Sequence, residues 1–317
     1  MKLVYFNDYR LGVLKGGNSV VDVTSVVRKI PHTAPGDLMN NLIARFSEYR
    51  GALSRAASDG VGVPVAQVKL LPPLPRPVNV DCMAVNYMED GTRKEPAPIN
   101  AFHKSPGCIV GHGDTMVLPD IAATIFEGEA ELAFVIGKRA SHVTQARAME
   151  HVFGYVNFID GSARGVLPPG NTFYQMKSRA SFAPIGPYLV TADEIKDPHK
   201  LQVRLWVNGA LKQNYNTDDM ANKIPRIIEW ISSIHDLEPG DVIATGTNHR
   251  GLSAFQDGDT VELEIDGLGR LAVKVRDELK RTWARETRLE RELKGLKGTT
   301  PQLTGKYAQT EQKDTGG

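Results

Sequence analysis

Short apolar runs separated by turn residues dominate the sequence between Val80 and Asp277. Runs of roughly four to eight such residues bounded by Gly, Pro, Asn and Asp are typical of β-strands. Long helical segments do not alternate with them, which argues against a doubly wound parallel sheet. We therefore predict a mixed α+β, β-rich fold with one large domain over residues 80–277. The runs are VDCMAVNY, CIVG, TMVLP, ELAFVIG, VFGYVNFID, PYLVT, LQVRLWVNG, DVIATGT, TVELEI and RLAVKV.

Two local patterns inside this domain predict specific elements. Asn208-Gly209 separates LQVRLWV from ALKQN, and an Asn-Gly pair between strand-like runs is a strong signal for a two-residue hairpin. The segment KIPRIIEWISSI carries apolar residues at the spacing of an amphipathic helix.

Residues 1–70 are predicted to form a small, separate β-rich domain. KLVYF, RLGVLKG and SVVDVTSVV suggest an antiparallel meander. A helix is expected over residues 37–58, because apolar residues recur there near the helical period. Residues 71–79 contain four prolines, which rule out a regular helix or a central strand, and are the expected interdomain linker. The helical apolar positions are Leu38, Leu42, Ile43, Phe46 and Leu53.

The last segment, residues 278–317, is expected to hold a charged helix and a polar tail. Between Arg276 and Lys297, 13 of 22 residues are charged, yet several leucines and Trp283 recur on roughly one stripe. This pattern predicts a helix on the surface or between subunits. The Gly- and Pro-rich residues after it are expected to be disordered unless a partner subunit orders them.

Charge and cysteine content narrow the classes of partner and compartment. The chain has 317 residues with 38 positive and 37 negative side chains, which argues against a nucleic-acid or anionic-membrane partner. Asp8 and Arg10 interrupt the N-terminal apolar run too early for a signal peptide. Cys82 and Cys108 fit neither a disulfide framework nor a zinc site, so we expect both to be buried and reduced in a cytoplasmic protein.

The segment IFEGEAELAFVIGK carries the most chemical information. Glu127, Glu129 and Glu131 alternate along a predicted strand, so their side chains share one face about 6.7 Å apart. A divalent cation would neutralise them, and all-oxygen ligation favours Mg²⁺, Mn²⁺ or Ca²⁺ over Zn²⁺. Alternatively, the three carboxylates lie on a solvated face. Asp160, at the end of the run GYVNFID, is either a fourth acidic ligand or an ordinary turn residue.

Six segments in order give the chain a resemblance to the fumarylacetoacetate hydrolase family. The match spans roughly residues 80–275, and the small leading domain is also similar to that of the family. The segments are FEGEAELAFVIGK, GYVNFIDGSARG, MKSRASFAPIGPYLVT, VNGALKQNYNTDDM, LEPGDVIATGT and DGDTVELEIDGLGRL.

The resemblance implies a β-roll catalytic domain with a metal site in its mouth. It implies Mg²⁺ or Mn²⁺ held by Glu129, Glu131 and Asp160, with Ca²⁺ as a third candidate. Glu127 then lies behind the ligands, on the surface, or substitutes for one of them. Lys177 matches the family lysine near the metal, although a lone lysine is otherwise a solvated charge.

Three further residues match substrate-contacting positions of the family. Thr247 and the Gly246 backbone correspond to its Gly-Thr pair, and Tyr87 to its Asn-Tyr pair. An ordinary loop threonine and a buried aromatic are the alternative interpretations of these side chains.

The chain departs from the family where a lid histidine usually follows the Asn-Tyr pair. Asp90 occupies that position, so Glu89 or Asp90 is the candidate general base, since burial raises a carboxyl pKa. His249 either binds a substrate carboxylate or faces solvent. His103, beside a lysine that matches a Phe-x-Lys position of the family, is expected to be an ordinary strand or loop histidine.

These residues predict a metal-dependent hydrolase that cleaves a C–C bond in a 2,4-dioxo acid or a related β-dicarbonyl carboxylate. In that scheme the metal chelates the substrate and Lys177 stabilises the enolate. The alternative is a tautomerase, isomerase or decarboxylase of an oxo acid on the same metal site. A third hypothesis is a catalytically silent member that only binds a metal–carboxylate ligand. The family resemblance also implies a homodimer or homotetramer.

Overall fold

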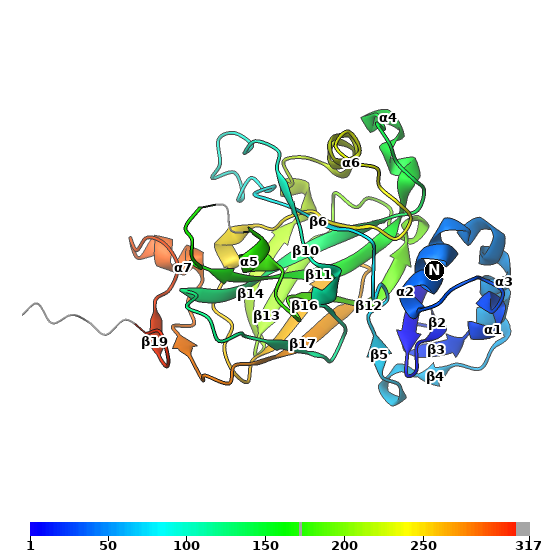
Figure 1. Cartoon of the computed structure of the whole chain (residues 1–317), viewed down its shortest axis with the longest axis horizontal. Coiled ribbons are helices and arrows are strands. Elements are labelled where there is room, and N and C mark those ends of the chain that lie inside the picture. Colours follow the sequence, from blue (N-terminus) through cyan, green and yellow to red (C-terminus); the bar gives the residue numbers. More distant parts are fainter. Residues whose placement is uncertain (171–172, 309–317) are drawn as a thin grey trace, which may run out of the picture.

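The computed structural model describes residues 1–170 and 173–308, and two β-sheets form most of the molecule (Figure 1). The larger sheet has 12 strands in the order β4-β3-β2-β1-β12-β11-β10-β15-β6-β7, with β5 beside β1 and β8 beside β12. The smaller sheet has five strands in the order β14-β13-β16-β17-β9. This architecture confirms the predicted β-rich, mixed α+β class.

The strands of the larger sheet are β1 (Lys2–Phe6), β2 (Arg10–Lys15), β3 (Ser19–Asp22), β4 (Val63–Pro64), β5 (Leu70–Leu71), β6 (Val80–Met83), β7 (Ala101–His103), β8 (Ile109–Val110), β10 (Ile125–Ile136), β11 (Val152–Arg164), β12 (Ala183–Thr191) and β15 (Val242–Ala244). Those of the smaller sheet are β9 (Thr115–Val117), β13 (Gln202–Val207), β14 (Ala210–Asn216), β16 (Thr260–Ile265) and β17 (Arg270–Arg276). A separate pair is formed by β18 (Thr282–Trp283) and β19 (Gln302–Thr304). The helices are α1 (Thr24–Val27), α2 (Pro35–Ala44), α3 (Phe46–Asp59), α4 (Gln145–Ala148), α5 (Phe173–Lys177), α6 (Ile224–Ser232) and α7 (Arg288–Leu293).

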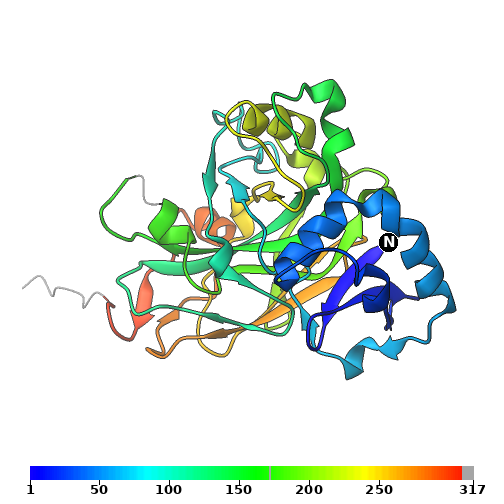
Figure 2. The same ribbon diagram turned by 45° about the vertical axis from the view of Figure 1, so that its right-hand side comes forward.

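The β10–β11 pair is the centre of the fold, and every residue of β10 is buried. Because strand side chains alternate, the two faces of the pair enter different cores. Leu132 and Phe134 pack into the core shared with the smaller sheet. Ala133 and Val135 pack on the opposite face, against the N-terminal strands and helices, which are blue in Figure 2. A glutamate on either face of β10 is therefore withdrawn from water.

The N-terminal segment confirms the predicted meander, since β1, β2 and β3 pair in sequence. The strand ends at Asp22, however, and the following TSVV is helical. β1 also pairs with β12, so the larger sheet runs from the N-terminal strands into the predicted catalytic domain without a break. Residues 72–79 are neither helix nor strand, as their prolines require.

The single helix predicted over residues 37–58 is wrong, because the chain breaks at Arg45 into α2 and α3. Arg45 leaves helical geometry, with φ −115° and ψ 19°. After the break, Phe46 packs edge-on against Phe153, with ring centroids 4.9 Å apart. A tertiary contact thus accompanies a change of direction that the apolar spacing alone does not reveal.

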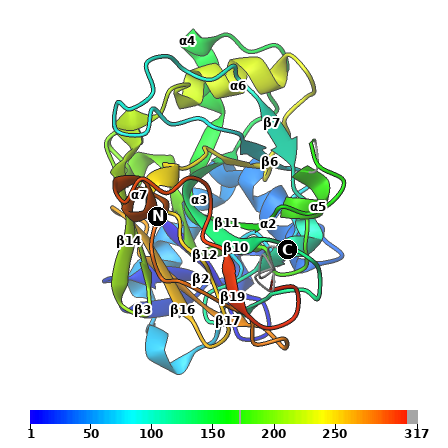
Figure 3. The ribbon, with the colours of Figure 1, turned by 90° about the vertical axis from the view of Figure 1, so that its left-hand side faces the viewer.

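Both local predictions in the large domain are confirmed. Asn208 and Gly209 connect β13 and β14 with φ of 52° and 78°, the left-handed geometry that a two-residue hairpin turn demands. The amphipathic helix is α6, which lies above β6 and β7 in Figure 3. Both cysteines are buried and free.

The charged helix predicted between Arg276 and Lys297 is confirmed only for the six residues of α7, and the rest of that span is not helical. Arg281 explains the difference. Its guanidinium is fully buried, pairs with both oxygens of Asp277 at 2.9 Å, and lies 4.6 Å from the ring centroid of Phe126. These contacts hold residues 277–283 against the core, and Trp283 is buried beside Phe126.

The polar tail predicted to be disordered is ordered in part, because β19 pairs with β18. The remainder of that prediction, residues 309–317, lies outside the described residues. In the part of the chain that the structure covers, no helix is long and apolar enough to cross a membrane.

The buried Asp277–Arg281 pair predicts a large difference between two neighbouring carboxylates. Asp277→Asn leaves a buried guanidinium without its counter-charge, which we expect to lower the free energy of unfolding by about 3–5 kcal/mol. Glu278→Gln, whose ion pair with Arg276 is exposed, should lower it by less than about 1 kcal/mol. Urea unfolding measures both values. Equal effects would contradict a structural role for the buried pair.

Candidate metal centre and its surroundings

Three carboxylates converge where β10 and β11 pair. Glu129 lies directly opposite Asp160, and Glu131 follows two residues later on the same face. Further along the strands, this face continues as the apolar surface that packs on the N-terminal segment. Glu129 is 5% exposed, whereas Glu131 and Asp160 are fully buried. One oxygen from each carboxylate lies within 4.8 Å of the other two.

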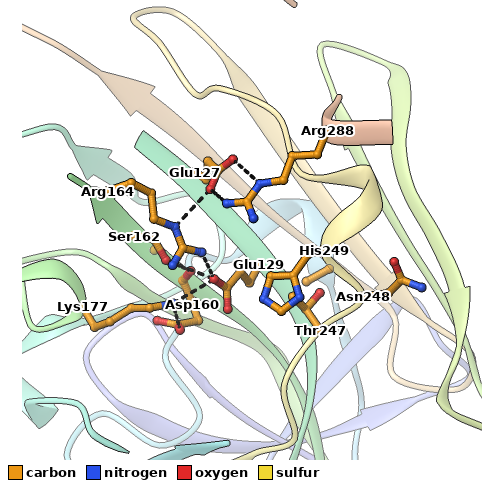
Figure 4. A network of polar contacts seen from close by, with 12 residues as sticks. Glu127, Glu129, Asp160, Ser162, Arg164, Lys177, Thr247, Asn248, His249 and Arg288 are labelled. Carbon is orange, nitrogen blue, oxygen red and sulfur yellow. Dashed lines mark hydrogen bonds and ion pairs between the residues drawn. The ribbon is translucent and has the colours of Figure 1, made fainter. Parts of the chain in front are cut away.

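Three cationic side chains partly neutralise this cluster. Lys177, at the end of α5, contacts both Glu129 and Asp160, and its ammonium lies 2.9 Å from Glu129 Oε1. Lys104, directly after β7, is paired with the other oxygen of Asp160. Arg164, at the end of β11, contacts Glu129 (Figure 4). The protein therefore supplies part of the positive charge that we expected from a metal ion alone.

Glu131 remains incompletely satisfied within this arrangement. Its Oε2 accepts a hydrogen bond from the Gly246 N–H at 2.7 Å, but its buried Oε1 has no hydrogen-bond partner. No lysine or arginine of the described chain forms an ion pair with it. Burial, followed by the charges of Asp160 and Glu129, raises the pKa of Glu131 well above its usual range. An unpartnered buried oxygen beside two more carboxylates fits a divalent cation.

Two neighbouring groups, Glu129 and Lys177, have pKa values shifted so that each keeps its charged form. Burial by itself would raise the pKa of Glu129, but Lys177 and Arg164 outweigh it and hold that pKa well below its usual range. Burial by itself would lower the pKa of Lys177, but Asp160 and Glu129 outweigh it and raise the pKa. Glu129 is thus held as the anion and Lys177 as the cation, which suits a ligand beside a charged donor.

Glu127 is buried but lies outside the three-carboxylate cluster. Its carboxylate pairs with Arg164 at 3.1 Å and with Arg288 from α7 (Figure 4). Arg164 thus bridges Glu127 and Glu129. This geometry agrees with the expectation that Glu127 stands behind the ligands, and α7 contributes through Arg288.

The loop after β15 brings Gly246 and Thr247 to the cluster. Gly246 has φ +87°, and an added Cβ would lie 3.1 Å from Cβ of Asn86, so glycine allows its N–H to reach Glu131. The Thr247 hydroxyl accepts from Gln213 Nε2 at 2.8 Å and donates to Tyr215 Oη at 3.3 Å. Thr247 is 1% exposed. The loop is therefore fixed by contacts on both sides.

Tyr87 is buried near this loop, against the same Tyr215 that Thr247 contacts. Its ring packs edge-on against Tyr215 at 5.0 Å, and its buried hydroxyl has no hydrogen-bond partner. Both the substrate-contact interpretation and the buried-aromatic interpretation of Tyr87 are compatible with this position.

Glu89 and His249 form a pair that the sequence analysis did not anticipate. Glu89 Oε1 lies 2.7 Å from His249 Nδ1, and Glu89 Oε2 accepts the His249 backbone N–H at 2.9 Å. Glu89 is buried, and the His249 ring lies beside Glu129 (Figure 4). The structure thus brings together Glu89, one of the two predicted candidate bases, and His249, which was predicted to bind substrate or to face solvent.

Asp90 lies differently from Glu89. Its N–H donates to Asp219, and its half-exposed carboxylate lies 3.7 Å from Arg250. Of the two candidate bases, only Glu89 contacts a histidine at the cluster.

Gln213 is a site residue that the sequence analysis missed. It receives the Ala130 N–H at 3.0 Å and donates to Thr247 and to the Asn248 carbonyl. It shares a strand face with Tyr215, two residues on, so the alternation of β14 could have indicated that both side chains point inward.

Comparison with known proteins agrees with this architecture. Residues 79–276 match the family described as fumarylacetoacetate (FAA) hydrolase, C-terminal. Because this span covers more than half of the chain, the protein belongs to the fumarylacetoacetate hydrolase family. The resemblance inferred from the six sequence segments is confirmed, as is the expected fold.

Relatives in this family have different named activities. The chain is 34% identical over 293 residues to a mitochondrial oxaloacetate tautomerase of Xenopus laevis, which covers 86% of this chain and 89% of the relative. It is 32% identical over 294 residues to the maleylpyruvate hydrolase of Aquipseudomonas alcaligenes, with 87% and 99% covered. The maleylpyruvate hydrolase of Sphingobium sp. SYK-6, solved with manganese(II) and pyruvate, superimposes with a TM-score of 0.79 at 35% identity over 87% of this chain and 99% of that one.

The raised pKa of Glu131 predicts how the metal-free protein responds to pH. An unfolded glutamate has a pKa of about 4.3, so the contribution of Glu131 to stability is complete below that pH. The contribution is lost as the pH rises from there through the higher folded-state pKa. In the presence of EDTA, Glu131→Gln should therefore gain stability relative to the wild type as the pH rises across this window. Urea unfolding at several pH values measures the difference.

The matched control for this prediction is Glu264→Gln, on the outer face of β16, where the carboxylate pairs with Arg270. Because that ion pair forms only with the charged carboxylate, Glu264→Gln should not gain stability relative to the wild type as the pH rises over the same values. If Glu131→Gln gains none either, the carboxylate repulsion inferred here is wrong.

Proposed function

We propose that this protein is a divalent-metal-dependent hydrolase that cleaves a C–C bond in a 2,4-dioxo acid or related β-dicarbonyl carboxylate. One observation carries the proposal: three buried carboxylates with an unpartnered Glu131 oxygen adjoin the hydrogen-bonded Glu89–His249 pair. The first element suits a hard cation, and the second supplies an imidazole that can accept a proton.

Glu129, Glu131 and Asp160 are the proposed ligands, and Mg²⁺ or Mn²⁺ the proposed ion. When bound, the ion supplies Lewis-acid chemistry that polarises a substrate carbonyl. The manganese and pyruvate in the Sphingobium maleylpyruvate hydrolase support this choice of cation and of an oxo-acid substrate.

Lys177 and Lys104 are proposed to stabilise negative charge that develops on the substrate. Lys177 is 2% exposed and Lys104 1% exposed, so both ammonium groups act in a site where little water competes with them. Each is anchored on Asp160, from a different side. This anchoring places fixed positive charge around the cluster before substrate arrives.

The proposed general base is His249, oriented by Glu89. The Glu89 carboxylate accepts a hydrogen bond from the Nδ1–H of His249. This leaves Nε2 free to take a proton from the attacking water. Glu89 also stabilises the imidazolium that forms, as a carboxylate does in other carboxylate–histidine pairs. His249 in this chain is thus proposed to replace the lid histidine that the family places after the Asn-Tyr pair.

The second candidate is a tautomerase, isomerase or decarboxylase of an oxo acid on the same metal site. The oxaloacetate tautomerase relative favours it. In the tautomerase version, His249 Nε2 removes a proton from the carbon beside the carbonyl instead of from water. The geometry serves both reactions, because each needs one positioned base and a stabilised enolate.

The expected homodimer or homotetramer and the cytoplasmic location stay predictions.

The identity of the products separates the two reactions. Metal-free protein supplied with Mg²⁺ or Mn²⁺ should convert a 2,4-dioxo acid to two acids, which mass spectrometry detects. Activity should disappear in Glu131→Ala and Lys177→Ala, and direct titration should show Mn²⁺ affinity weakened by more than about 100-fold in Glu131→Ala. Turnover of oxaloacetate without change of mass would establish the tautomerase, and loss of CO₂ alone the decarboxylase.

The Glu89–His249 pair makes a more specific prediction. His249→Ala should lower kcat by about 10²–10⁴-fold while leaving Mn²⁺ affinity within about tenfold, because a general base contributes that much to the chemical step. Glu89→Gln should cause a smaller loss, and added imidazole should restore part of the activity of His249→Ala.

Asp90→Asn tests the other predicted carboxylate, and we expect a loss of less than about tenfold because Asp90 is half-exposed and contacts Arg250. His151→Ala is the matched histidine control, since this half-buried side chain contacts the Lys138 carbonyl and lies outside the carboxylate cluster. A large loss in Asp90→Asn with a small one in His249→Ala would assign the base to Asp90.

A further inference from the structure

A second group of metal-ligating side chains lies at the edge of the larger sheet, outside the three-carboxylate cluster. It consists of Asp81 on β6, His103 at the end of β7, and His235 just after α6. One ligand atom from each lies within 4.8 Å of the other two. Because Asp81 and Cys82 are adjacent on β6, their side chains point to opposite faces of the sheet. Burial, and then the charges of Asp160 and Glu131, raise the pKa of the Cys82 thiol, so Cys82 is on the side of the sheet that holds the carboxylate cluster. Asp81 therefore points away from that cluster.

The three side chains adopt an arrangement suited to binding a cation. His103 Nδ1 lies 2.8 Å from Asp81 Oδ1, and His235 Nε2 lies 3.6 Å from Asp81 Oδ2. The two imidazole centroids are 5.6 Å apart. His103 and Asp81 face each other directly across β6 and β7, so the sheet register itself brings them together.

Two independent features point to a missing ligand. The first is Asp81 Oδ2, a buried oxygen with no hydrogen-bond partner on a residue that is only 3% exposed. The second is the His235 ring, whose Nδ1 lies 2.9 Å from the Asp236 carbonyl. That carbonyl can only accept, so Nδ1 donates to it, and Nε2 is the ring nitrogen that lies 3.6 Å from Asp81 Oδ2. A ligating histidine commonly donates its other N–H to a carbonyl in this way.

We propose that Asp81, His103 and His235 form a second cation site, selective for a transition metal of the Zn²⁺ type. Two imidazoles and one carboxylate suit Zn²⁺ and its first-row neighbours, whereas Mg²⁺ and Ca²⁺ prefer oxygen ligands. His103 is 66% and His235 30% exposed at the side chain, so solvent can reach the site and water can complete the coordination. This proposal does not depend on the proposed catalytic reaction.

A hydrogen bond between His103 and Asp81 alone is the simpler alternative. It uses only Asp81 Oδ1 and leaves the buried Oδ2 without a hydrogen-bond partner, 3.6 Å from His235 Nε2. A shared cation would give Asp81 Oδ2 a partner and bind both imidazoles at once.

The site would cross-link three segments that lie far apart in the sequence. It would tie the edge strand β7 to β6 and to the chain that leaves α6, which lies above both strands in Figure 3. β7 continues directly into Lys104, whose ammonium contacts Asp160 in the carboxylate cluster. The outer cation would therefore steady the backbone next to a lysine of the inner site.

Metal titration of the full, tag-free chain tests this proposal, since a polyhistidine tag would itself bind Zn²⁺. The chain is first saturated with Mg²⁺ to fill the carboxylate cluster, and Zn²⁺ is then added in a calorimeter. We expect one further equivalent to bind, and Co²⁺ to give the visible absorption of a site with nitrogen ligands. His103→Ala and His235→Ala should each weaken this binding by more than about 100-fold.

Two further variants separate the outer site from the inner one. Glu131→Gln should lose binding at the carboxylate cluster but keep the Zn²⁺ equivalent. His151→Ala changes a histidine outside both groups of ligands and should behave as the wild type in both respects. Zn²⁺ should also raise the Tm of the wild type and not that of His103→Ala. The proposal is overturned if His103→Ala binds the same number of Zn²⁺ equivalents as the wild type with unchanged affinity, or if Glu131→Gln abolishes all of them.

Discussion

The antiparallel register of β10 and β11 is the constraint on which the rest of the structure depends. It sets Glu129 opposite Asp160 and places Glu131 on the same buried face. Isolated carboxylates are expensive to bury, and three together repel one another. Nearly every neighbouring element therefore contributes a cation or an N–H to this face.

The contributing groups come from distant parts of the sequence. Lys104 follows β7, Lys177 ends α5, and Arg288 reaches Glu127 from α7. α7 is held near the core by the buried Asp277–Arg281 pair that precedes it. The C-terminal segment follows an irregular path that buries Arg281, whose desolvation is offset by Asp277 and by the carbonyls of Pro119 and Ile121.

The same face also fixes the loops that complete the site. Glu131 accepts the Gly246 N–H, and Asn86 Nδ2 donates to the Thr245 carbonyl just before it. Asn86 begins the segment that carries Glu89, and Gly246 begins the one that carries His249. Two loops tied to one another at Asn86 therefore deliver the two members of the hydrogen-bonded pair, and their approach depends on a glycine that tolerates φ +87°.

Much of this arrangement follows from the sequence because β-strands have a period of two. The alternation of Glu127, Glu129 and Glu131 indicated one acidic face, and the order of the six segments indicated the family. Local spacing could not show that Arg45 breaks a helix so that Phe46 meets Phe153, nor that Arg281 would be buried. Those outcomes depend on contacts between segments far apart in the sequence, which a periodic pattern does not contain.

The proposed exchange of the lid histidine for His249 illustrates why position in the sequence is a poor guide to a catalytic group. An imidazole and a carboxylate need only share a hydrogen bond of normal length and face the reacting atoms, whichever loop supplies each one. In this chain the segment after Tyr87 supplies the carboxylate and the segment after Thr247 supplies the imidazole, 2.7 Å apart. Glu89 has φ +57°, in the left-handed region that non-glycine residues rarely adopt. The backbone there accepts an uncommon conformation while both Glu89 oxygens bond His249, which is consistent with a pair that the fold maintains for its chemistry.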